Sequence, residues 1–314
     1  MQTALFTHSV CLDHDPGPGH PECPDRLRAI MRLLEREEFA LLDRREAPLA
    51  TIDQIALAHP RDHAERLLSR VPEDGFVDLD VDTAINPASG QAALRAAGAV
   101  CAAIDAVMAG PLTPEGARNA FCAVRPPGHH AETVRAMGFC LFNSVAIGAL
   151  HAQQAHGLSR VAVIDFDVHH GNGTQEIFWQ LAGLLYASVH QSPLYPGTGA
   201  ASERGADDNI VNVPLAPHAG SVEFRRAMSA QILPAIDSFG PELILISAGF
   251  DAHSLDPMAH LNLQEGDFTW ATEQLLALAD AHCRGRVVSS LEGGYNLTAL
   301  ASCTAAHVRA LMNV

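Results

Sequence analysis

The chain has 314 residues, of which 48% are hydrophobic and 18% are charged. This apolar content excludes a disordered chain, and the length fits one α/β domain, so residues 1–314 are expected to fold as a single domain. The formal net charge of −16 disfavours nucleic acid as a partner, because phosphate binding needs clustered lysines and arginines.

Membrane insertion is not expected, because the longest apolar stretch, Ala96–Ile104, is too short to span a bilayer. The first residues lack the basic patch and long apolar stretch of a secretory signal, which makes a cytoplasmic location the expectation. The seven cysteines include no Cys-x-x-Cys pair, so they are predicted to be small buried side chains rather than disulfides or zinc ligands.

Short apolar runs rich in β-branched residues predict buried strands with helices between them. In chain order, the predicted strands are Ala4–Thr7, Ala120–Val124, Val161–Asp165, Leu184–Val189, Leu243–Ser247 and Arg286–Leu291. Apolar residues at helical spacing predict helices around Leu27–Leu34, with Asp25 as the cap, and around Phe224–Ile232 and Phe268–Leu275. This alternation predicts an α/β fold with right-handed crossovers and a mostly parallel sheet.

Polar side chains and glycines follow four of these strands at the point where each strand ends. The segments are His129-His130, Asp165–His170, Gly249–Asp251 and Glu292–Tyr295. Ligand sites in open α/β sheets lie at the carboxyl ends of the strands, so we expect the four segments to form one site.

The segment Asp165-Phe166-Asp167-Val168-His169 suggests a metal site. In extended backbone its two carboxylates and its imidazole point the same way, which is costly to bury without a cation or hydrogen bonds. A solvated acidic loop is the alternative for this segment alone. Other groups near the strand ends favour a hydrolytic metal site, namely His129-His130, Asp251, His253, Asp256 and Tyr295.

Seven stretches together resemble the histone deacetylase and acetylpolyamine amidohydrolase family, which has the arginase–deacetylase fold. They are HPECPDR (His20–Arg26), RPPGHHA (Arg125–Ala131), MGFCLFN (Met137–Asn143), DFDVHHGNGT (Asp165–Thr174), YPGTG (Tyr195–Gly199), SAGFDAHSLDP (Ser247–Pro257) and EGGYNL (Glu292–Leu297). They occur in the family's order and cover nearly the whole chain. The resemblance implies a three-layer α/β/α domain whose mostly parallel sheet has about eight strands.

The resemblance also implies the ions. Asp167, His169 and Asp256 are expected to hold one catalytic ion, expected to be Zn²⁺, although Fe²⁺ and Co²⁺ also suit two carboxylates and one histidine. A structural K⁺ is implied behind it. Its ligands are the main-chain carbonyls of Asp165, Asp167, His169 and Val189 and the side chains of Asp165 and Ser188.

The same resemblance assigns the catalytic side chains. His129 and His130 are placed beside the attacking water, with His129 paired to Asp165 and His130 paired to Asn172. His130 is the expected general base, and Tyr295 is expected to stabilise the oxyanion from the opposite side. Asn172 is similar to the class II branch, where class I usually has aspartate, and Tyr295 differs from the histidine of the weakly active class IIa members.

Five residues are expected to bind the substrate, of which Phe139 and Tyr195 match tunnel positions of the family. Phe139 and Tyr195 are expected to line a tunnel for a linear aliphatic chain, and Gly138 to let that chain pass close to the backbone. Leu263 is expected at the tunnel rim, and one of the two loop aspartates, Asp80 or Asp82, is expected to hold a substrate amide, with Asp82 taken as the candidate. Core packing is the alternative for the aromatic pair, and a solvated loop for Asp82.

The expected function is removal of an acetyl or other acyl group from an amine, such as acetyl-lysine or an acetylated polyamine. A binuclear ureohydrolase similar to the arginases is one alternative, although Tyr295 and the histidine pair do not fit it. A catalytically silent module that binds an acylated ligand is the other. The sequence leaves open the natural substrate and whether the chain forms a homo-oligomer.

Overall fold

An eight-stranded sheet forms the centre of the fold in this computed structural model, which describes residues 3–313. The strand order is β2-β1-β5-β10-β9-β6-β7-β8, and all neighbouring strands run parallel. The strands are β1 (Thr3–Thr7), β2 (Asp43–Glu46), β5 (Asn119–Cys122), β6 (Val161–Asp165), β7 (Leu184–Gln191), β8 (Ile210–Leu215), β9 (Leu243–Ala248) and β10 (Val287–Leu291). The predicted parallel α/β architecture is confirmed.

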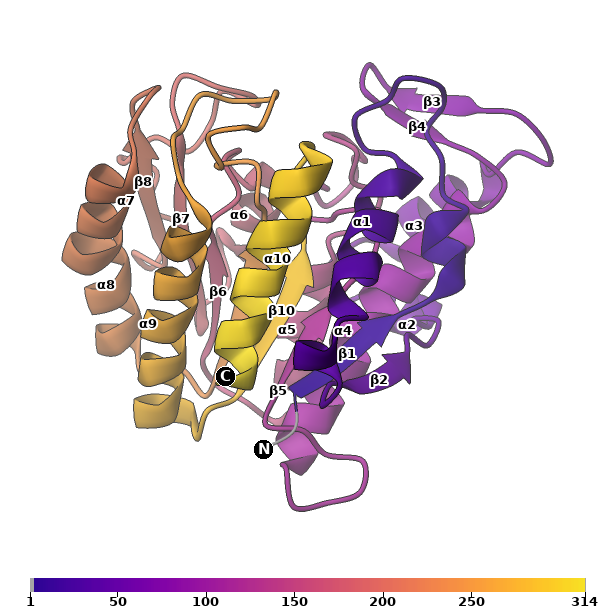
Figure 1. The fold of residues 1–314 in the computed structure, drawn as a ribbon. Coiled ribbons are helices and arrows are strands. Elements are labelled where there is room, and N and C mark those ends of the chain that lie inside the picture. The colour runs from indigo at the N-terminus through magenta and orange to yellow at the C-terminus, as the bar shows by residue number, and fades with distance from the viewer. Residues whose placement is uncertain (1–2, 314) are drawn as a thin grey trace.

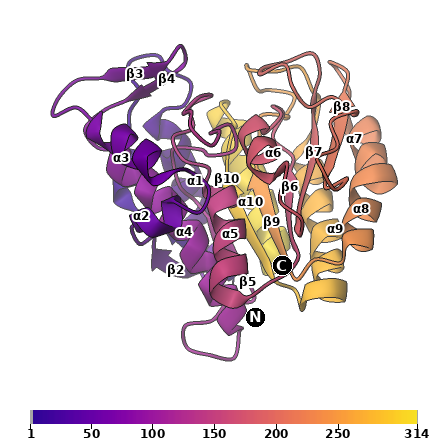
Figure 2. The ribbon, with the colours of Figure 1, turned by 180° about the vertical axis from the view of Figure 1, so that it is seen from behind.

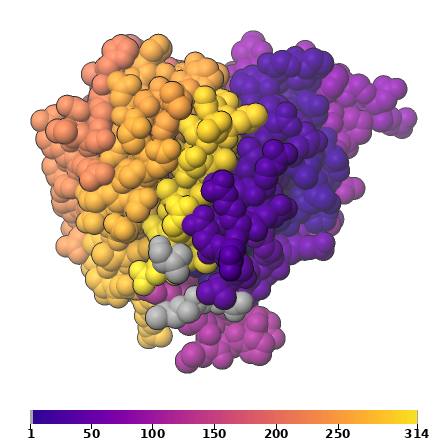
Figure 3. All heavy atoms as spheres, viewed as in Figure 1, coloured from indigo at the N-terminus to yellow at the C-terminus, as the bar shows by residue number. Residues whose placement is uncertain are grey.

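Helices cover both faces of this sheet and complete the predicted three layers (Figure 1). One layer contains α1 (Pro24–Leu34), α7 (Ser221–Ala227), α8 (Leu233–Phe239), α9 (Glu265–Cys283) and α10 (Leu297–Met312). The other, seen from behind in Figure 2, contains α2 (Ile52–Ile55), α3 (Arg61–Ser69), α4 (Ser89–Ala109), α5 (Ser144–His156) and α6 (Asn172–Phe178). In the space-filling view α10 lies between α9 and α1, so the last helix of the chain packs against the first (Figure 3).

Burial explains which strands the sequence revealed. Every residue of β5, β6, β9 and β10 is buried, so these strands are mostly apolar and lack the alternation of a strand with one exposed face. The edge strand β2 has the sequence Asp-Arg-Arg-Glu and alternates between partly buried and exposed residues, while the opposite edge strand β8 contains Pro214. Charged residues and proline are common at sheet edges, and they hid both strands from the sequence analysis.

A small antiparallel hairpin, β3 (Val77–Asp80) and β4 (Thr83–Ile85), lies outside the main sheet and was also not predicted. Helix α1 begins at Pro24 after Cys23, so Asp25 lies in its first turn rather than at its cap as predicted. All seven cysteines are free, and all except Cys23 are buried.

The strand order brings the four polar strand ends together. Strands β5, β10, β9 and β6 are consecutive in the sheet, so the segments that follow them leave the same edge side by side. Strand β6 ends at Asp165, and the chain then bends instead of continuing in extended form through His169 as predicted.

Helix α4 is long and apolar enough to cross a membrane, and 67% of its most apolar window is buried inside the protein. Arg95 and Asp105 bound the uninterrupted run Ala96–Ile104, and further apolar residues of the helix lie beyond both of them. The helix packs against α5 and against strands β5, β10 and β1, which is the position of a core helix.

Gly98 allows α4 to lie directly against the backbone of residues 48–50. A Cβ at Gly98 would lie 2.1 Å from the carbonyl oxygen of Pro48 and 2.7 Å from the nitrogen of Ala50. Main-chain atoms cannot swing aside as the end of a flexible side chain can, so a larger residue must push the helix away from this segment.

Replacing Gly98 by alanine is therefore expected to lower the free energy of unfolding by about 1–3 kcal/mol, although alanine is the better helix former. The matched control is Gly266→Ala in α9, because a Cβ at Gly266 meets no atom within 4 Å. Urea unfolding of both variants measures the difference. Equal stabilities of the two variants would contradict the close helix–backbone contact.

Candidate active site

Two adjacent histidines lie in the loop after β5, and each has its own partner. His129 Nδ1 is 3.0 Å from Asp165 Oδ2, at the end of β6, and His130 Nδ1 is 2.8 Å from Asn172 Oδ1, at the start of α6. The ring centres lie 4.0 Å apart. The two pairings are those that the family resemblance implied.

The two imidazoles have opposite pKa shifts. Burial alone lowers the pKa of His129, but the nearby carboxylates of Asp167 and Asp165 outweigh this effect and raise its pKa well above the usual range. Burial, together with the positive charges of His129 and His169, holds the pKa of His130 well below its usual range. At neutral pH the pair therefore consists of one imidazolium and one neutral imidazole.

Three side chains of the kinds that can bind a metal ion meet beside this pair. His169 Nδ1 lies 3.1 Å from Asp167 Oδ1 and 3.2 Å from Asp251 Oδ2. One ring nitrogen carries at most one hydrogen, so it cannot fully satisfy both carboxylates. Asp251 Oδ2 is buried and has no hydrogen-bond partner in the described part of the chain. Burial, with the charge of Asp167, raises the pKa of Asp251 to about 7.

This donor set fits a divalent cation. The potential ligand atoms of Asp167, His169 and Asp251 all lie within 4.8 Å of one another, and all three side chains are buried. Buried carboxylates that are short of hydrogen bonds are costly unless a positive charge compensates them. Two carboxylate oxygens and one imidazole nitrogen are ordinary ligands for zinc and for other first-row divalent ions.

Asp256, the third ligand implied by the family resemblance, lies at the same edge but outside this group of three. Its Oδ2 accepts hydrogen bonds from the nitrogens of Tyr295 at 2.7 Å and Asn296 at 3.1 Å. It is close enough for its charge to contribute to the raised pKa of Asp251. Its role as a ligand stays a prediction, and Asp251 is a carboxylate donor that the sequence analysis noted but did not assign.

Two glycines let main chain approach the reacting groups. Gly293 donates its N–H to Asp167 Oδ2 at 2.8 Å, and a Cβ there would lie 2.0 Å from Asp251 Oδ2. Gly138 has a φ of +57°, and a Cβ there would lie 2.5 Å from the ring of His130. Any larger residue at either position would displace the carboxylates or the histidine.

Glu292 holds the main chain that carries the histidine pair, and no role was predicted for it. Its Oε2 accepts hydrogen bonds from the nitrogens of Gly128 at 2.7 Å and His129 at 3.1 Å. Burial raises the pKa of this carboxyl to about 7, against the lowering effect of the His129 charge. Its position directly after a fully buried strand was the available signal.

Arg26 fixes the segment that presents Tyr295. The guanidinium of Arg26 is fully buried, donates to the carbonyl oxygens of Gly294 at 2.6 Å and Glu292 at 2.5 Å, and lies 4.8 Å from the centre of the Tyr295 ring. Burial raises the pKa of Tyr295 well above its usual range. The phenol is therefore protonated at neutral pH and able to donate a hydrogen bond.

A pocket of about 200 Å³ opens onto these groups. Its lining is mostly apolar and comprises Asp82, His130, Gly138, Phe139, His169, Tyr195, Met258 and Tyr295. The Phe139 and Tyr295 rings meet edge to face with centres 5.8 Å apart, and the Tyr195 ring lies 5.1 Å from that of His130. Aromatic walls of this kind suit a narrow, linear aliphatic group.

The pocket contains four of the five predicted substrate-binding residues. Leu263 is the exception, because its side chain is fully buried in the core and is not part of the lining. Met258, two residues beyond Asp256, lines the pocket instead and was not predicted. Asp82 Oδ1 accepts a hydrogen bond from the nitrogen of Gly138 at 3.1 Å, so this carboxylate also fixes the wall of the pocket.

The residues predicted to bind potassium lie on β6, on the neighbouring strand β7 and in the segment that follows β6. Asp165 on β6 is the register partner of Ser188 on β7, and Val189 follows directly. Asp165 Oδ2 also accepts a hydrogen bond from the Tyr186 hydroxyl at 3.0 Å, a contact that the sequence analysis did not foresee. These residues are together in space, and potassium binding stays a prediction.

Comparison with known proteins agrees with this geometry. Residues 20–311 match the histone deacetylase domain. A chloroplastic protein of Arabidopsis thaliana, histone deacetylase 14, is 37% identical over 98% of this chain and 76% of its own length. The histone deacetylase-like amidohydrolase of Pseudomonas aeruginosa is 36% identical, over 100% of this chain and 87% of its own.

A solved structure gives the same result for the fold. The crystal structure of the HDA15 HD domain is 35% identical, with a TM-score of 0.91 over 99% of this chain and 88% of that chain. At this identity and coverage the likeness extends over nearly the whole chain. The chain described here belongs to the histone deacetylase family.

Proposed function

We propose that this protein is a metal-dependent amidohydrolase that removes acetyl or related acyl groups from amines. The observation that carries the proposal is the histidine pair with opposite pKa shifts, set between a cluster of metal-ligating side chains and an apolar pocket. Hydrolysis of an amide needs a base, an acid and a group that stabilises the oxyanion, and these side chains supply all three.

Asp167 and His169 are proposed to hold one divalent ion with a third carboxylate, for which Asp256 and Asp251 are the candidates. Zinc is the proposed ion, and Fe²⁺ and Co²⁺ suit the same donors. When bound, such an ion polarises the acyl oxygen and lowers the pKa of water to about 7. A potassium ion at Asp165 and Ser188 is proposed as a second, structural ion.

His130 acts as the general base. Its Nδ1 is engaged by Asn172 Oδ1, which fixes a hydrogen on Nδ1 and leaves the lone pair on Nε2 to take a proton from the attacking water. The low pKa of His130 keeps that lone pair available at neutral pH. The protonated imidazole then delivers the proton to the leaving amine.

His129 and Tyr295 stabilise charge rather than transfer protons. His129, paired with Asp165, remains an imidazolium and offsets the negative charge of the tetrahedral intermediate. The Tyr295 phenol donates a hydrogen bond to the oxyanion, since its raised pKa keeps it protonated.

The proposed substrate is a linear acylated amine, such as an acetyl-lysine side chain or an acetylated polyamine. Phe139 and Tyr195 leave room for an unbranched stem, and Asp82 at the pocket supplies a carboxylate that attracts a cationic or amide-bearing group. We also expect the protein to be cytoplasmic and to act on such small acylated amines. No observation favours the arginase-like reaction or a silent binding module over this reaction.

The proposal predicts that zinc-loaded protein releases acetate from at least one member of a panel of acylated amines. The panel contains an acetyl-lysine peptide, acetylputrescine, acetylspermidine and longer acyl-lysines. Activity is expected to disappear after chelation and to return with Zn²⁺, Co²⁺ or Fe²⁺. Acetate release that is insensitive to chelators, or urea release from arginine, would refute the assignment.

Replacing Tyr295 by phenylalanine is expected to lower kcat by roughly 10²–10³-fold, because one oxyanion donor is lost. The ring and its contacts with Phe139 and Arg26 are preserved, so folding and metal content are expected to match the wild type. Steady-state kinetics with parallel metal analysis checks both statements. A turnover near that of the wild type would remove Tyr295 from the mechanism.

The pH profile tests the role of His130. Because its pKa lies well below 6.5, the base is unprotonated at neutral pH, and the acid limb of kcat/KM is expected below pH 6.5. In Asn172→Asp a carboxylate faces His130 Nδ1, which should raise the pKa of the imidazole by about 1 unit or more and move the acid limb to higher pH.

Glu132 requires a control in this experiment, because its Oε1 accepts a hydrogen bond from Asn172 Nδ2 at 2.8 Å. The double variant Asn172→Asp with Glu132→Gln removes the repulsion between the two carboxylates. An acid limb at the same pH in the wild type and in both variants would exclude His130 as the group that titrates.

A further inference from the structure

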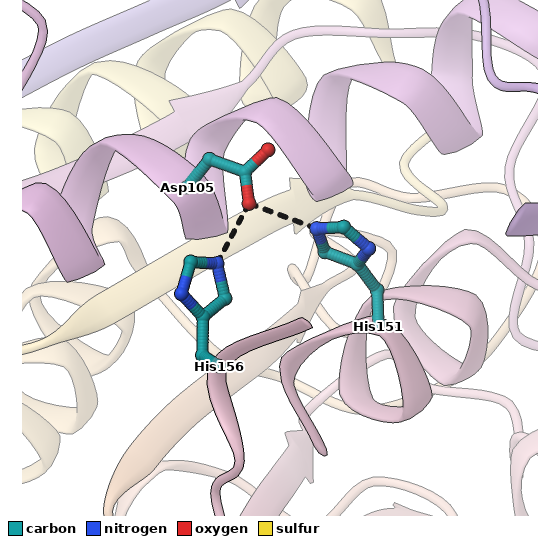
Figure 4. Close-up of side chains that lie close together, drawn as sticks. All are labelled: Asp105, His151 and His156. Atoms are coloured by element: carbon teal, nitrogen blue, oxygen red, sulfur yellow. Dashed lines mark hydrogen bonds and ion pairs between the residues drawn. The ribbon is translucent and has the colours of Figure 1, made fainter. Parts of the chain in front are cut away.

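A second group of metal-ligating side chains lies between α4 and α5, away from the pocket. His151 Nε2 is 2.8 Å and His156 Nε2 is 2.7 Å from the same atom, Asp105 Oδ1. Figure 4 shows both imidazole rings pointing at this one oxygen from α5, while Asp105 comes from α4. In the described part of the chain, only this group and the one in the active site bring such ligand atoms within 4.8 Å of one another.

The group lies at the opposite end of the sheet from the active site. His156 is the last residue of α5, and the chain then enters β6 at its amino end, whereas the active-site residues follow the carboxyl ends of the strands. Asp105 is in the last turns of α4, which ends at Ala109. The group therefore belongs neither to the pocket nor to the proposed catalytic ion.

From this geometry we propose that Asp105, His151 and His156 form a second binding site, for one divalent transition-metal ion such as Zn²⁺. Two imidazole nitrogens and a carboxylate oxygen are a common zinc donor set with a coordination position left for water. The ends of α4 and α5 add the partial negative charge of their last carbonyls, which favours a cation there. The ion ties the two helices together.

The dimensions suit such an ion after a small adjustment. Zn–N and Zn–O distances of about 2.0–2.1 Å place tetrahedral ligand atoms about 3.3 Å apart, slightly more than the 2.8 Å and 2.7 Å that separate the two imidazole nitrogens from Asp105 Oδ1. The Asp105 side chain is 53% exposed, so its carboxylate is free to turn. His151 is held more firmly, with its side chain 11% exposed.

An ordinary ion pair on the surface looks different. His282 Nε2 lies 2.7 Å from Asp237 Oδ1, but that group contains only one imidazole. At Asp105 two imidazole nitrogens lie within hydrogen-bond distance of one carboxylate oxygen, and when unprotonated each of these nitrogens supplies a lone pair to a metal ion. His282→Gln is thus a matched control for His156→Gln, because each removes a histidine near the end of a helix, with its side chain 25% and 24% exposed, from an aspartate.

The test counts zinc ions per chain after dialysis of the full-length protein against buffered free Zn²⁺. Two ions are expected for the wild type and for His282→Gln, and one for His156→Gln and for Asp105→Asn. Zinc is also expected to raise the melting temperature of an Asp167→Asn variant, in which only the second site remains intact, and not that of Asp167→Asn combined with His156→Gln.

The same zinc content in His156→Gln as in the wild type would overturn the proposal. Melting curves in chelator show whether each variant folds before zinc is added. If the catalytic site held no ion, the wild type would bind one ion and His156→Gln none, so the two proposals fail separately. Zinc-loaded His156→Gln is expected to keep the amidohydrolase activity of the wild type, since the second site lies far from the pocket.

Discussion

Buried carboxylates at the carboxyl edge of the sheet set the main physical constraint on this molecule. Asp165, Asp167, Asp251 and Glu292 are almost completely removed from water within one small region. Charges buried in this way need compensation from hydrogen bonds, imidazolium groups or cations. The histidine pair, the glycine main chain and the proposed ions all follow from that need, because each supplies positive charge or hydrogen-bond donors to these oxygens.

The difference between the two adjacent histidines arises from the same constraint. His129 faces Asp165 and is also near Asp167, whereas His130 faces the neutral amide of Asn172. Two chemically identical side chains at adjacent positions therefore acquire opposite protonation states. A hydrolytic site that needs both a fixed positive charge and a free base obtains them from one His-His sequence.

The sequence predicted the parts of the fold that depend on burial. Apolar runs such as Val161–Asp165 identified the central strands, and the polar residues that follow them identified the edge that carries the site. The edge strand β2, made of four charged residues, could not be recognised, because its stability comes from pairing with β1 rather than from apolar side chains. Leu263 was predicted at the rim, but its side chain is fully buried, and Met258 lines the pocket.

Within the site, motif matching assigned the histidine pair and Tyr295 but overlooked residues that act through the main chain. Glu292 holds the loop that carries His129, and Arg26 holds the loop that carries Tyr295. Neither role can be recognised from the sequence. The Asp105 group was equally hidden, because Asp105 is 46 and 51 residues away in sequence from the two histidines that it meets. Tertiary packing of two helices, rather than a local motif, brings these side chains together.

Anomalous diffraction from crystals of the zinc-loaded protein, measured on both sides of the zinc absorption edge, tests the central claim most directly. We predict a strong zinc peak at bonding distance from Asp167 and His169, with a carboxylate of Asp256 or Asp251 as the third ligand. One coordination position of the ion is expected to face the pocket. A map without a peak at Asp167 and His169, or with two zinc ions bridged by carboxylates there, would contradict it.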